Sequence, residues 1–181
     1  MLFRSFVGSL TRLKRPLDVI KVFQRVKTQT DTVSLSIIGA FEDRAYEHEM
    51  KQYISQRGIK DVFFLGSLKQ EEVALFMRRA GVLVLASAQE NSPMVIAEAM
   101  ASGLPVVASR VGGVPVMVDN ERDGLLFESG DVHGAAGAVI RLLKDQRLRG
   151  DLSRNGRRKA ETMFSPDIVA KKTVELYRTL L

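Results

Sequence analysis

Short apolar runs alternate along this chain with longer segments in which apolar residues recur at helical spacing. Continuous apolar runs bounded by glycine or polar residues are typical of strands that are buried on both faces. We expect about six such strands, at residues 2–8, 33–39, 62–66, 82–86, 105–108 and 124–127. Strands separated by helical segments favour a parallel sheet with helices on both faces, so the pattern predicts a doubly wound, Rossmann-like α/β fold.

Helix signals occupy the segments between and after these strands. Ser67 and Gln70 have the spacing of a capping box and predict a helix at residues 71–80. Ser165 followed by Pro166 predicts the cap and first turn of a final helix. The other helical segments are residues 16–26, 44–57, 132–144 and 148–163. We therefore expect a single domain over residues 1–181, with extra helices at its C-terminal end.

Function is expected in the loops that follow the strands, because open parallel sheets bind ligands at the carboxyl ends of their strands. The loop after Gly39 has one glycine where a nicotinamide-binding fingerprint has three, and no Walker-type Gly-Lys-Ser/Thr occurs. Hydride transfer and nucleotide hydrolysis are therefore not indicated.

The loop after the fourth strand contains a candidate anion site. Ser92 followed by Pro93 predicts a helix start, with the serine hydroxyl as the cap and the proline in the first turn. The free amides of Met94 and Val95 then point out of the helix end, where the helix dipole favours a phosphate. Because this helix follows a buried strand, the anion site lies at the carboxyl edge of the sheet.

Two glutamates flank that anion site. Glu98 shares a helix face with Met94 and Val95 and is placed to accept hydrogen bonds from a ribose diol beside the helix. Glu90 lies in the preceding loop and is placed to accept bonds from hydroxyls of the group that the phosphate carries. From spacing alone, a solvated loop residue and a surface helix residue remain alternatives. Glu98 lies, however, in the otherwise apolar stretch 95–101, where an ionised carboxylate needs a polar partner.

Composition removes several classes of protein. The chain has 181 residues, no cysteine and two histidines, His48 and His133. A disulfide framework, a Cys-ligated metal and a thiol nucleophile are therefore excluded, and a multi-histidine metal site is disfavoured. Every apolar stretch falls far short of the ~20 residues that cross a bilayer. The lack of cysteine suits a reducing compartment, so we expect a cytoplasmic protein.

Two basic zones stand out in a chain of net charge +6. Residues 1–27 hold seven Lys/Arg against one acidic residue, and the zone from Arg141 to Lys159 holds eight against two. A solvated helix face is one interpretation of the second zone, and attraction to phosphates, as at an anionic membrane surface, is the other. The basic residues are not interleaved with aromatic residues and no nucleic-acid-binding motif occurs, so we expect no nucleic-acid partner.

Several ordered motifs give a family resemblance. Glu90 and Glu98 are followed by Ala-Met-Ala-Ser-Gly-Leu-Pro-Val-Val-Ala-Ser at 99–109. The other motifs are Val-Gly-Ser-Leu at 7–10 with Lys14, Leu-Ser-Ile-Ile-Gly at 35–39, Val-Phe-Phe-Leu-Gly at 62–66, Val-Gly-Gly-Val-Pro at 111–115, and Asp-Gly-Leu-Leu-Phe at 123–127 with Gly-Asp at 130–131. Together they resemble the donor-binding half of retaining glycosyltransferases with two facing Rossmann-like domains, the GT-B fold, known as group 1 or family 4 glycosyltransferases.

The resemblance implies the C-terminal half of an enzyme that transfers a hexosyl group, with retention, from a nucleotide-diphosphate sugar to an acceptor held by a missing N-terminal domain. It implies that Glu90 contacts the donor sugar, Glu98 the ribose and Lys14 the departing diphosphate. It further implies that the Asn91-to-Val95 backbone contacts the distal phosphate and sugar, and that the loop with Ser67 and Leu68 lies beside the base. The implied catalytic residues are Lys14 and Glu90, and the implied donor-binding residues are Gly8, Arg12, Lys14, Ser67, Leu68, Glu90, Asn91, Ser92, Pro93, Met94, Val95 and Glu98. Neither a cofactor nor a metal is implied.

Two positions depart from the family pattern. Ser9 stands where members carry an arginine as a second cation for the diphosphate, and Arg12 is the candidate substitute. Asn91-Ser92-Pro93 replaces the usual Gly-Phe-Gly. Without a partner domain, turnover by the isolated chain is not expected, so a catalytically inactive nucleotide-sugar-binding module of the same fold stays the alternative. A third hypothesis, a basic domain that docks peripherally on the inner membrane face or on nucleic acid, rests on charge alone.

Overall fold

The strands form two parallel sheets that meet at β1 and β4. The computed structural model describes residues 6–30 and 32–180. One sheet has the order β1 (Phe6–Val7), β2 (Leu35–Ile38) and β3 (Val62–Gly66), and the other has the order β4 (Leu83–Leu85), β5 (Val106–Ser109) and β6 (Leu125–Phe127). All described pairs are parallel, and β1 contacts β4. The strands thus follow the doubly wound order 3-2-1-4-5-6. The predicted α/β fold class is confirmed, with its strands divided between two ladders.

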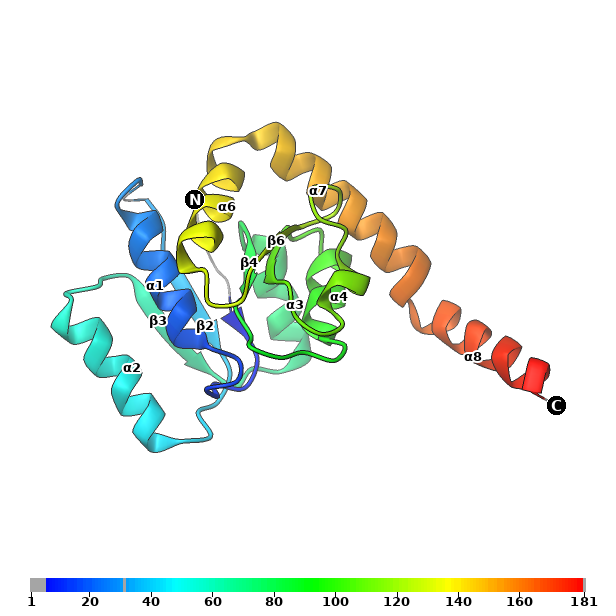
Figure 1. Cartoon of the computed structure of the whole chain (residues 1–181), viewed down its shortest axis with the longest axis horizontal. Helices are drawn as coiled ribbons and strands as arrows, with labels where there is room; N and C mark the ends of the chain where they lie inside the picture. The colour runs from blue at the N-terminus through cyan, green and yellow to red at the C-terminus, as the bar shows by residue number, and fades with distance from the viewer. Residues whose placement is uncertain (1–5, 31, 181) are drawn as a thin grey trace.

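Helices cover both faces of the sheets (Figure 1). One apolar core contains buried residues of α1 (Pro16–Lys27), α2 (Arg44–Gln56) and α6 (Val132–Lys144). The other contains buried residues of α3 (Gln70–Arg79), α4 (Met94–Ala101) and α5 (Val114–Met117). In β4, Val84 belongs to the first core, whereas Leu83 and Leu85 belong to the second. This alternation follows from the two-residue period of a strand and explains why the strand is apolar throughout.

Some strand ladders are shorter than the apolar runs that predicted them. Val33, Val82 and Ala86 are buried but lie outside the hydrogen-bonded strands. An apolar run indicates which residues are buried. Buried residues extend beyond the last hydrogen-bonded residue of the strand. Residues 2–5 of the first predicted strand lie outside the described residues.

The helix predicted at residues 71–80 is α3, but its predicted cap was wrong. The helix begins at Gln70, and the Lys69 amide donates to Glu72 Oε2 over 2.9 Å. The chain is still extended at Lys69, with φ −68° and ψ 152°. The capping hydrogen bond therefore forms two residues later than the pair Ser67 and Gln70 predicts.

The C-terminal region is helical, as predicted, but the segment 148–163 is not a single α-helix. Helix α7 (Gln146–Lys159) runs into a π-helical turn, η1 (Ala160–Phe164), before α8 (Pro166–Leu180). Ser165 Oγ accepts a hydrogen bond from the Ile168 amide (3.4 Å), which confirms the predicted cap. Helix α8 projects away from the rest of the molecule (Figure 1). Within the ranges that the structure describes, no helix is both long and apolar enough to cross a membrane.

Candidate functional site

Three loops meet at the carboxyl edge of the sheets. The Ala88 amide, after β4, donates to the Leu13 carbonyl in the loop after β1 (2.8 Å). The Gly113 amide, after β5, donates to the Glu90 carbonyl (3.0 Å). These bonds bring segments that are distant in the sequence to the edge at which parallel sheets bind ligands.

Lys14 and Glu90 form an ion pair at this edge. Lys14 Nζ lies 2.8 Å from Glu90 Oε1 and 2.7 Å from Oε2, so one ammonium group contacts both carboxylate oxygens. Ser87 Oγ donates a further hydrogen bond to Glu90 Oε1 (2.7 Å). The Glu90 side chain is 5% exposed and the Lys14 side chain 31% exposed. The two residues predicted to be catalytic are therefore in direct contact.

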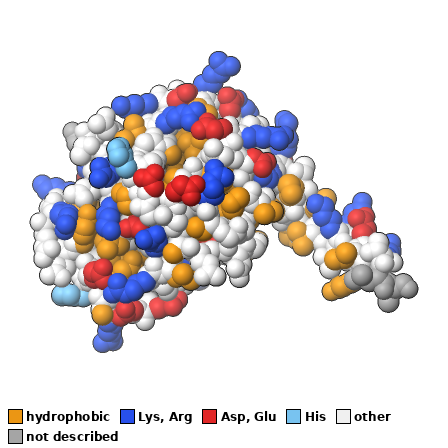
Figure 2. Space-filling view, viewed as in Figure 1, with side chains coloured by type: hydrophobic (Ala, Val, Ile, Leu, Met, Phe, Trp, Pro, Cys, Tyr) orange, Lys and Arg blue, Asp and Glu red, His pale blue; other side chains and the backbone are white. Residues whose placement is uncertain are grey.

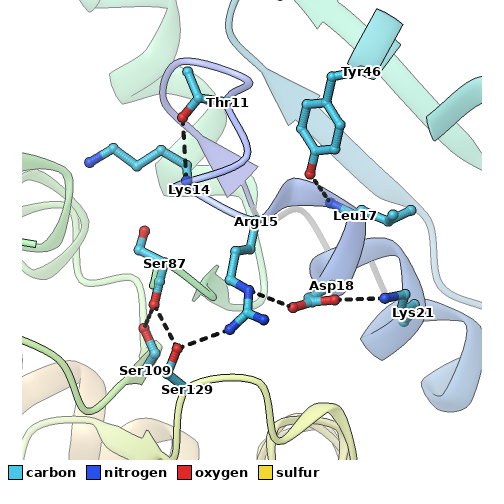
Figure 3. Close-up of polar contacts among 10 residues, drawn as sticks. All are labelled: Thr11, Lys14, Arg15, Leu17, Asp18, Lys21, Tyr46, Ser87, Ser109 and Ser129. Atoms are coloured by element: carbon cyan, nitrogen blue, oxygen red, sulfur yellow. Dashed lines mark hydrogen bonds and ion pairs between the residues drawn. The ribbon is translucent and has the colours of Figure 1, made fainter. Parts of the chain in front are cut away.

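A network of serines and one arginine holds the loop that carries Lys14 (Figure 3). The Ser87 carbonyl accepts hydrogen bonds from Ser109 Oγ (2.7 Å) and Ser129 Oγ (3.2 Å). Arg15 Nη1 donates to Ser129 Oγ (3.2 Å), and Arg15 Nε contacts Asp18 (3.1 Å). The network ties the loop after β1 to the ends of β4, β5 and β6.

Sequence reasoning missed this network. Ser109 and Ser129 stand at or just after strands β5 and β6, and that position was a usable signal. The position of Arg15 could not be predicted from its residue type. Its backbone is left-handed (φ 50°, ψ 44°), a conformation that glycine or asparagine usually adopts. Its neighbours Lys14 and Pro16 do not reveal this conformation.

Two glycines bring the loop after β5 against the backbone of Glu90 and Asn91. A Cβ at Gly112 would lie 1.8 Å from the Glu90 carbonyl oxygen, and one at Gly113 would lie 1.7 Å from the Asn91 carbonyl oxygen. A side chain at either position would push the loops apart. The glycine pair therefore fixes the position of the Glu90 backbone.

The N-terminus of α4 lies directly after this loop, and its predicted cap was wrong. Pro93 is the N-cap, with φ −70° and ψ 101°, and no side chain caps the described helix end. The Ser92 hydroxyl instead lies 3.9 Å from Met117 Sδ. The amides of Met94 and Val95 precede the first intrahelical hydrogen bond and remain available to an anion.

Glu98 lies one turn into α4 and is partly buried. Among the described residues, its carboxylate has no ion pair or side-chain hydrogen bond. The apolar surroundings that made Glu98 conspicuous in the sequence are confirmed, since Ile96, Ala97, Ala99 and Met100 are buried. The partner that a carboxylate in this position needs is not supplied by the described protein.

The remaining predicted residues lie around this edge without joining the ion pair. The Gly8 amide donates to the Ile38 carbonyl (3.0 Å), and Ser67 and Leu68 follow β3 directly. Arg12 points to α2, where it contacts Glu49 (2.7 Å) and lies 4.6 Å from the centre of the Tyr46 ring. The hydrogen bond that Arg12 donates to Glu49 raises the pKa of Arg12. In this structure Lys14 is thus the basic side chain paired with Glu90, and Arg12 is held elsewhere.

Several basic residues of the zone from Arg141 to Lys159 contact acidic residues from outside it. Arg141 contacts Glu121 (2.6 Å), and Arg157 contacts Glu161 (3.0 Å). Lys159 contacts both Asp119 (3.0 Å) and Asp123 (3.1 Å). Basic and acidic side chains are interspersed on the face in view in Figure 2. The excess of positive charge that the sequence suggests is therefore smaller on the folded surface.

No cluster of three or more His, Asp or Glu side chains that could hold a metal ion occurs within residues 6–30 and 32–180. Lys14 and the N-terminus of α4 place positive charge at the carboxyl edge. These two features can bind an anion, and Glu90 and Glu98 can accept hydrogen bonds from hydroxyl groups around it.

Comparisons with known proteins identify the family of the chain. The family model of glycosyl transferases group 1 matches residues 3–159. N-acetyl-alpha-D-glucosaminyl L-malate synthase of Bacillus anthracis is 30% identical over 176 residues, which cover 97% of this chain and 45% of that protein. The chain therefore spans about half the length of this relative.

Two solved structures share the fold. The C-terminal domain of a group 1 glycosyl transferase from Francisella tularensis has a TM-score of 0.84 at 23% identity, and the match covers 91% of this chain and 87% of that one. Anabaena HepE, solved in complex with UDP, has a TM-score of 0.90 at 23% identity, with 98% of this chain and 48% of that one covered. By its family match over most of its length, the chain belongs to the glycosyl transferases of group 1.

Proposed function

We propose that this chain binds the nucleotide-diphosphate-sugar donor of a glycosyltransferase that transfers a hexosyl group with retention of configuration. The observation that carries the proposal is the convergence of Lys14 and Glu90 beside the uncapped N-terminus of α4. Support also comes from the family, and from the fold match to HepE, a protein solved with UDP and with UDP-glucose. We further propose that an N-terminal domain holds the acceptor, since this chain spans about half of its relatives.

The charges at the edge suggest how the donor lies. The diphosphate would contact Lys14 and the amides of Met94 and Val95, where positive charge is available. Glu98 would accept hydrogen bonds from the ribose diol, and Glu90 from hydroxyls of the sugar. The base would lie near the loop after β3 that contains Ser67 and Leu68.

Departure of the diphosphate places a specific demand on Lys14. As the bond between the sugar and the diphosphate breaks, negative charge grows on the leaving oxygen, and a fixed cation stabilises that charge more than it stabilises the ground state. Lys14 and the helix end would supply this stabilisation, and we propose that neither a metal nor another cofactor takes part. The acceptor would attack from the face that the diphosphate leaves.

Calorimetry with a panel of ligands tests the proposal. UDP, GDP and ADP and their hexose derivatives are titrated into the chain, with the free nucleosides for comparison. We expect weak binding of at least one sugar nucleotide and much weaker binding of its nucleoside, because the phosphate contacts are charge-assisted. A chain that binds none of them would contradict the proposal.

A binding module without catalysis is the second candidate function. Ser9 and the pairing of Arg12 with Glu49 favour it, because both leave Lys14 without a second cation at the diphosphate. Transfer of sugar by the full protein that contains this chain separates the candidates, since an inactive module binds the donor without turnover. We propose a cytoplasmic location with peripheral membrane contact through the zone from Arg141 to Lys159.

A further inference from the structure

We propose that Glu90 competes with the donor's diphosphate for Lys14, and that the hydroxyls of the donor sugar relieve this competition. The inference rests on the proposed function. It makes Glu90 a specificity-determining residue that favours an intact sugar nucleotide over the nucleoside diphosphate left after transfer.

The first step is the geometry of the ion pair. Lys14 Nζ contacts both carboxylate oxygens of Glu90, at 2.8 and 2.7 Å. An ammonium group has three hydrogens, so this arrangement leaves one for another acceptor. The carboxylate also cancels the charge that would attract a phosphate. A diphosphate can therefore use Lys14 fully only when the contact with Glu90 loosens.

The second step is that Glu90 cannot turn to solvent. Its side chain is 5% exposed, and its backbone is fixed by the Gly113 amide and by the close approach of Gly112. When Lys14 moves to a phosphate, Ser87 Oγ is the remaining hydrogen-bond donor to this carboxylate among the contacts described above. A buried carboxylate that has lost its cation is strongly unfavourable.

The third step is chemical complementarity. A donor sugar carries several hydroxyl donors beyond the distal phosphate, whereas the hydroxyls of a nucleoside diphosphate lie on its ribose, which the proposed pose places at Glu98. Sugar hydroxyls that donate to Glu90 would replace the hydrogen bonds withdrawn by Lys14, so the intact donor satisfies both residues at once. After transfer the sugar is gone, Lys14 returns to Glu90, and the bound diphosphate loses its cation. The pair would thereby promote product release.

The variant Glu90→Gln tests the competition, because glutamine has nearly the same shape and no charge. The probes are UDP and UDP-glucose, or the pair in the calorimetric panel that binds the parent. We expect Glu90→Gln to bind the nucleoside diphosphate about tenfold more tightly than the parent does, as one charge-assisted hydrogen bond becomes available. The sugar nucleotide should gain nothing or bind more weakly, because the amide accepts hydroxyls less well.

Two further variants make the test specific. In a Lys14→Met background, Glu90→Gln should give no gain for the nucleoside diphosphate, since no cation is left to release. Glu161→Gln removes an exposed carboxylate that contacts Arg157, and it should leave both ligands unchanged. If Glu90→Gln does not fold, as judged by thermal unfolding, Glu90→Asp keeps the charge but shortens the reach to Lys14 and should give a smaller gain.

The outcomes separate this inference from the function on which it rests. Unchanged or weakened binding of the nucleoside diphosphate by folded Glu90→Gln would overturn the competition while leaving donor binding intact. A gain that persists without Lys14 would also overturn it. A parent chain that binds neither ligand would overturn the proposed function itself, and the competition with it.

Discussion

At the scale of single residues, Glu98 is the most direct test of donor binding. Its carboxylate is partly buried on an apolar helix and has no ion pair within the described residues. We expect Glu98→Ala to weaken binding of the sugar nucleotide by about 1–3 kcal/mol, because the ribose diol loses its acceptor. Glu98→Gln should lose less, since an amide oxygen still accepts. Calorimetry in which Glu98→Ala matches the parent would reject the ribose contact.

Lys14 should distinguish phosphates from the rest of the ligand. Lys14→Ala is expected to weaken binding of the sugar nucleotide by about 1.5–3 kcal/mol and to leave nucleoside binding nearly unchanged, as its contact is to phosphate charge. Lys21→Ala, which removes a lysine paired with Asp18 on α1, is the charge-matched control. Equal losses for nucleoside and sugar nucleotide would indicate a folding defect.

Arg12→Ala, measured beside Lys14→Ala, decides whether Arg12 replaces the arginine that is missing at position 9. Its contact with Glu49 predicts a smaller loss of sugar-nucleotide affinity than Lys14→Ala gives. A loss equal to that of Lys14→Ala would mean that Arg12 leaves Glu49 when the ligand binds.

The sequence predicts that Lys14 and Glu90 are site residues, but it does not predict that they contact each other. They are 76 positions apart, and each belongs to its own motif, so motif reasoning assigned each a separate ligand group. What joins them is the folding of two loops, through the bond from Ala88 to Leu13 and the left-handed turn at Arg15. Neither feature has a signature in residue type or spacing.

At the scale of elements, the glycine pair before α5 should control the loop that carries Glu90. Gly113→Ala is expected to destabilise the fold by about 1–3 kcal/mol, because the added Cβ would overlap the Asn91 carbonyl. The matched control is Gly137→Ala on the exposed side of α6, where an added Cβ meets nothing within 4 Å. That change should stabilise the helix by about 0.5–1 kcal/mol. Thermal unfolding compares the two, and similar shifts would contradict the packing argument.

Helix α7 is tied to the turn before β6 by Lys159, which predicts a pH-dependent effect. Burial raises the pKa of Asp123, and the hydrogen bond from Lys159 lowers the pKa of Asp119. A raised pKa means that the folded state binds this proton more tightly than the unfolded state does. Ionised Asp123 therefore lowers the free energy of unfolding at high pH, and this destabilisation decreases as the pH falls.

Lys159→Met should accordingly destabilise the fold by about 1–3 kcal/mol near neutral pH, since Asp123 loses a charged partner. The loss should shrink at acidic pH, because the raised pKa of Asp123 favours its protonation as the pH falls. Thermal unfolding at both pH values measures the difference. Arg157→Met removes an exposed cation of an exposed pair and should have little effect at either pH. A loss for Lys159→Met that is the same at both pH values would contradict the argument.

Elements were predictable where burial dominates and less so at helix starts. The segment 132–144 matches α6 at both ends, and each predicted strand overlaps an observed one. The caps of α3 and α4 were missed because Ser67 and Ser92 have the right residue type but the chain enters the helix later, at Lys69 and Pro93. A helix cap depends on backbone angles that are set by tertiary contacts, and residue type alone does not predict these angles.

At the scale of the whole molecule, topology followed from the alternation of buried strands and helices, whereas the distribution of charge did not. The zone from Arg141 to Lys159 counts eight basic residues against two acidic ones. Folding brings Asp119, Glu121 and Asp123 to it from the turn before β6. Such pairing depends on how α6 and α7 pack, so it cannot be predicted by counting charged residues along the sequence.

The last prediction concerns this surface and an anionic bilayer. Cations near such a bilayer contribute about 1 kcal/mol each, but those already paired with carboxylates contribute less. We expect weak co-sedimentation with vesicles that contain phosphatidylserine at ~0.01 M salt, and its loss near 0.15 M, where charges are screened beyond ~8 Å. Arg147→Glu with Arg158→Glu, both at exposed positions of α7, should abolish the association, while Arg44→Glu on α2 is the control. Absence of binding at low salt would contradict membrane contact through this zone. Binding that survives high salt would instead require an apolar surface. The projecting helix α8 offers one, because Val169, Leu176 and Tyr177 are exposed on it.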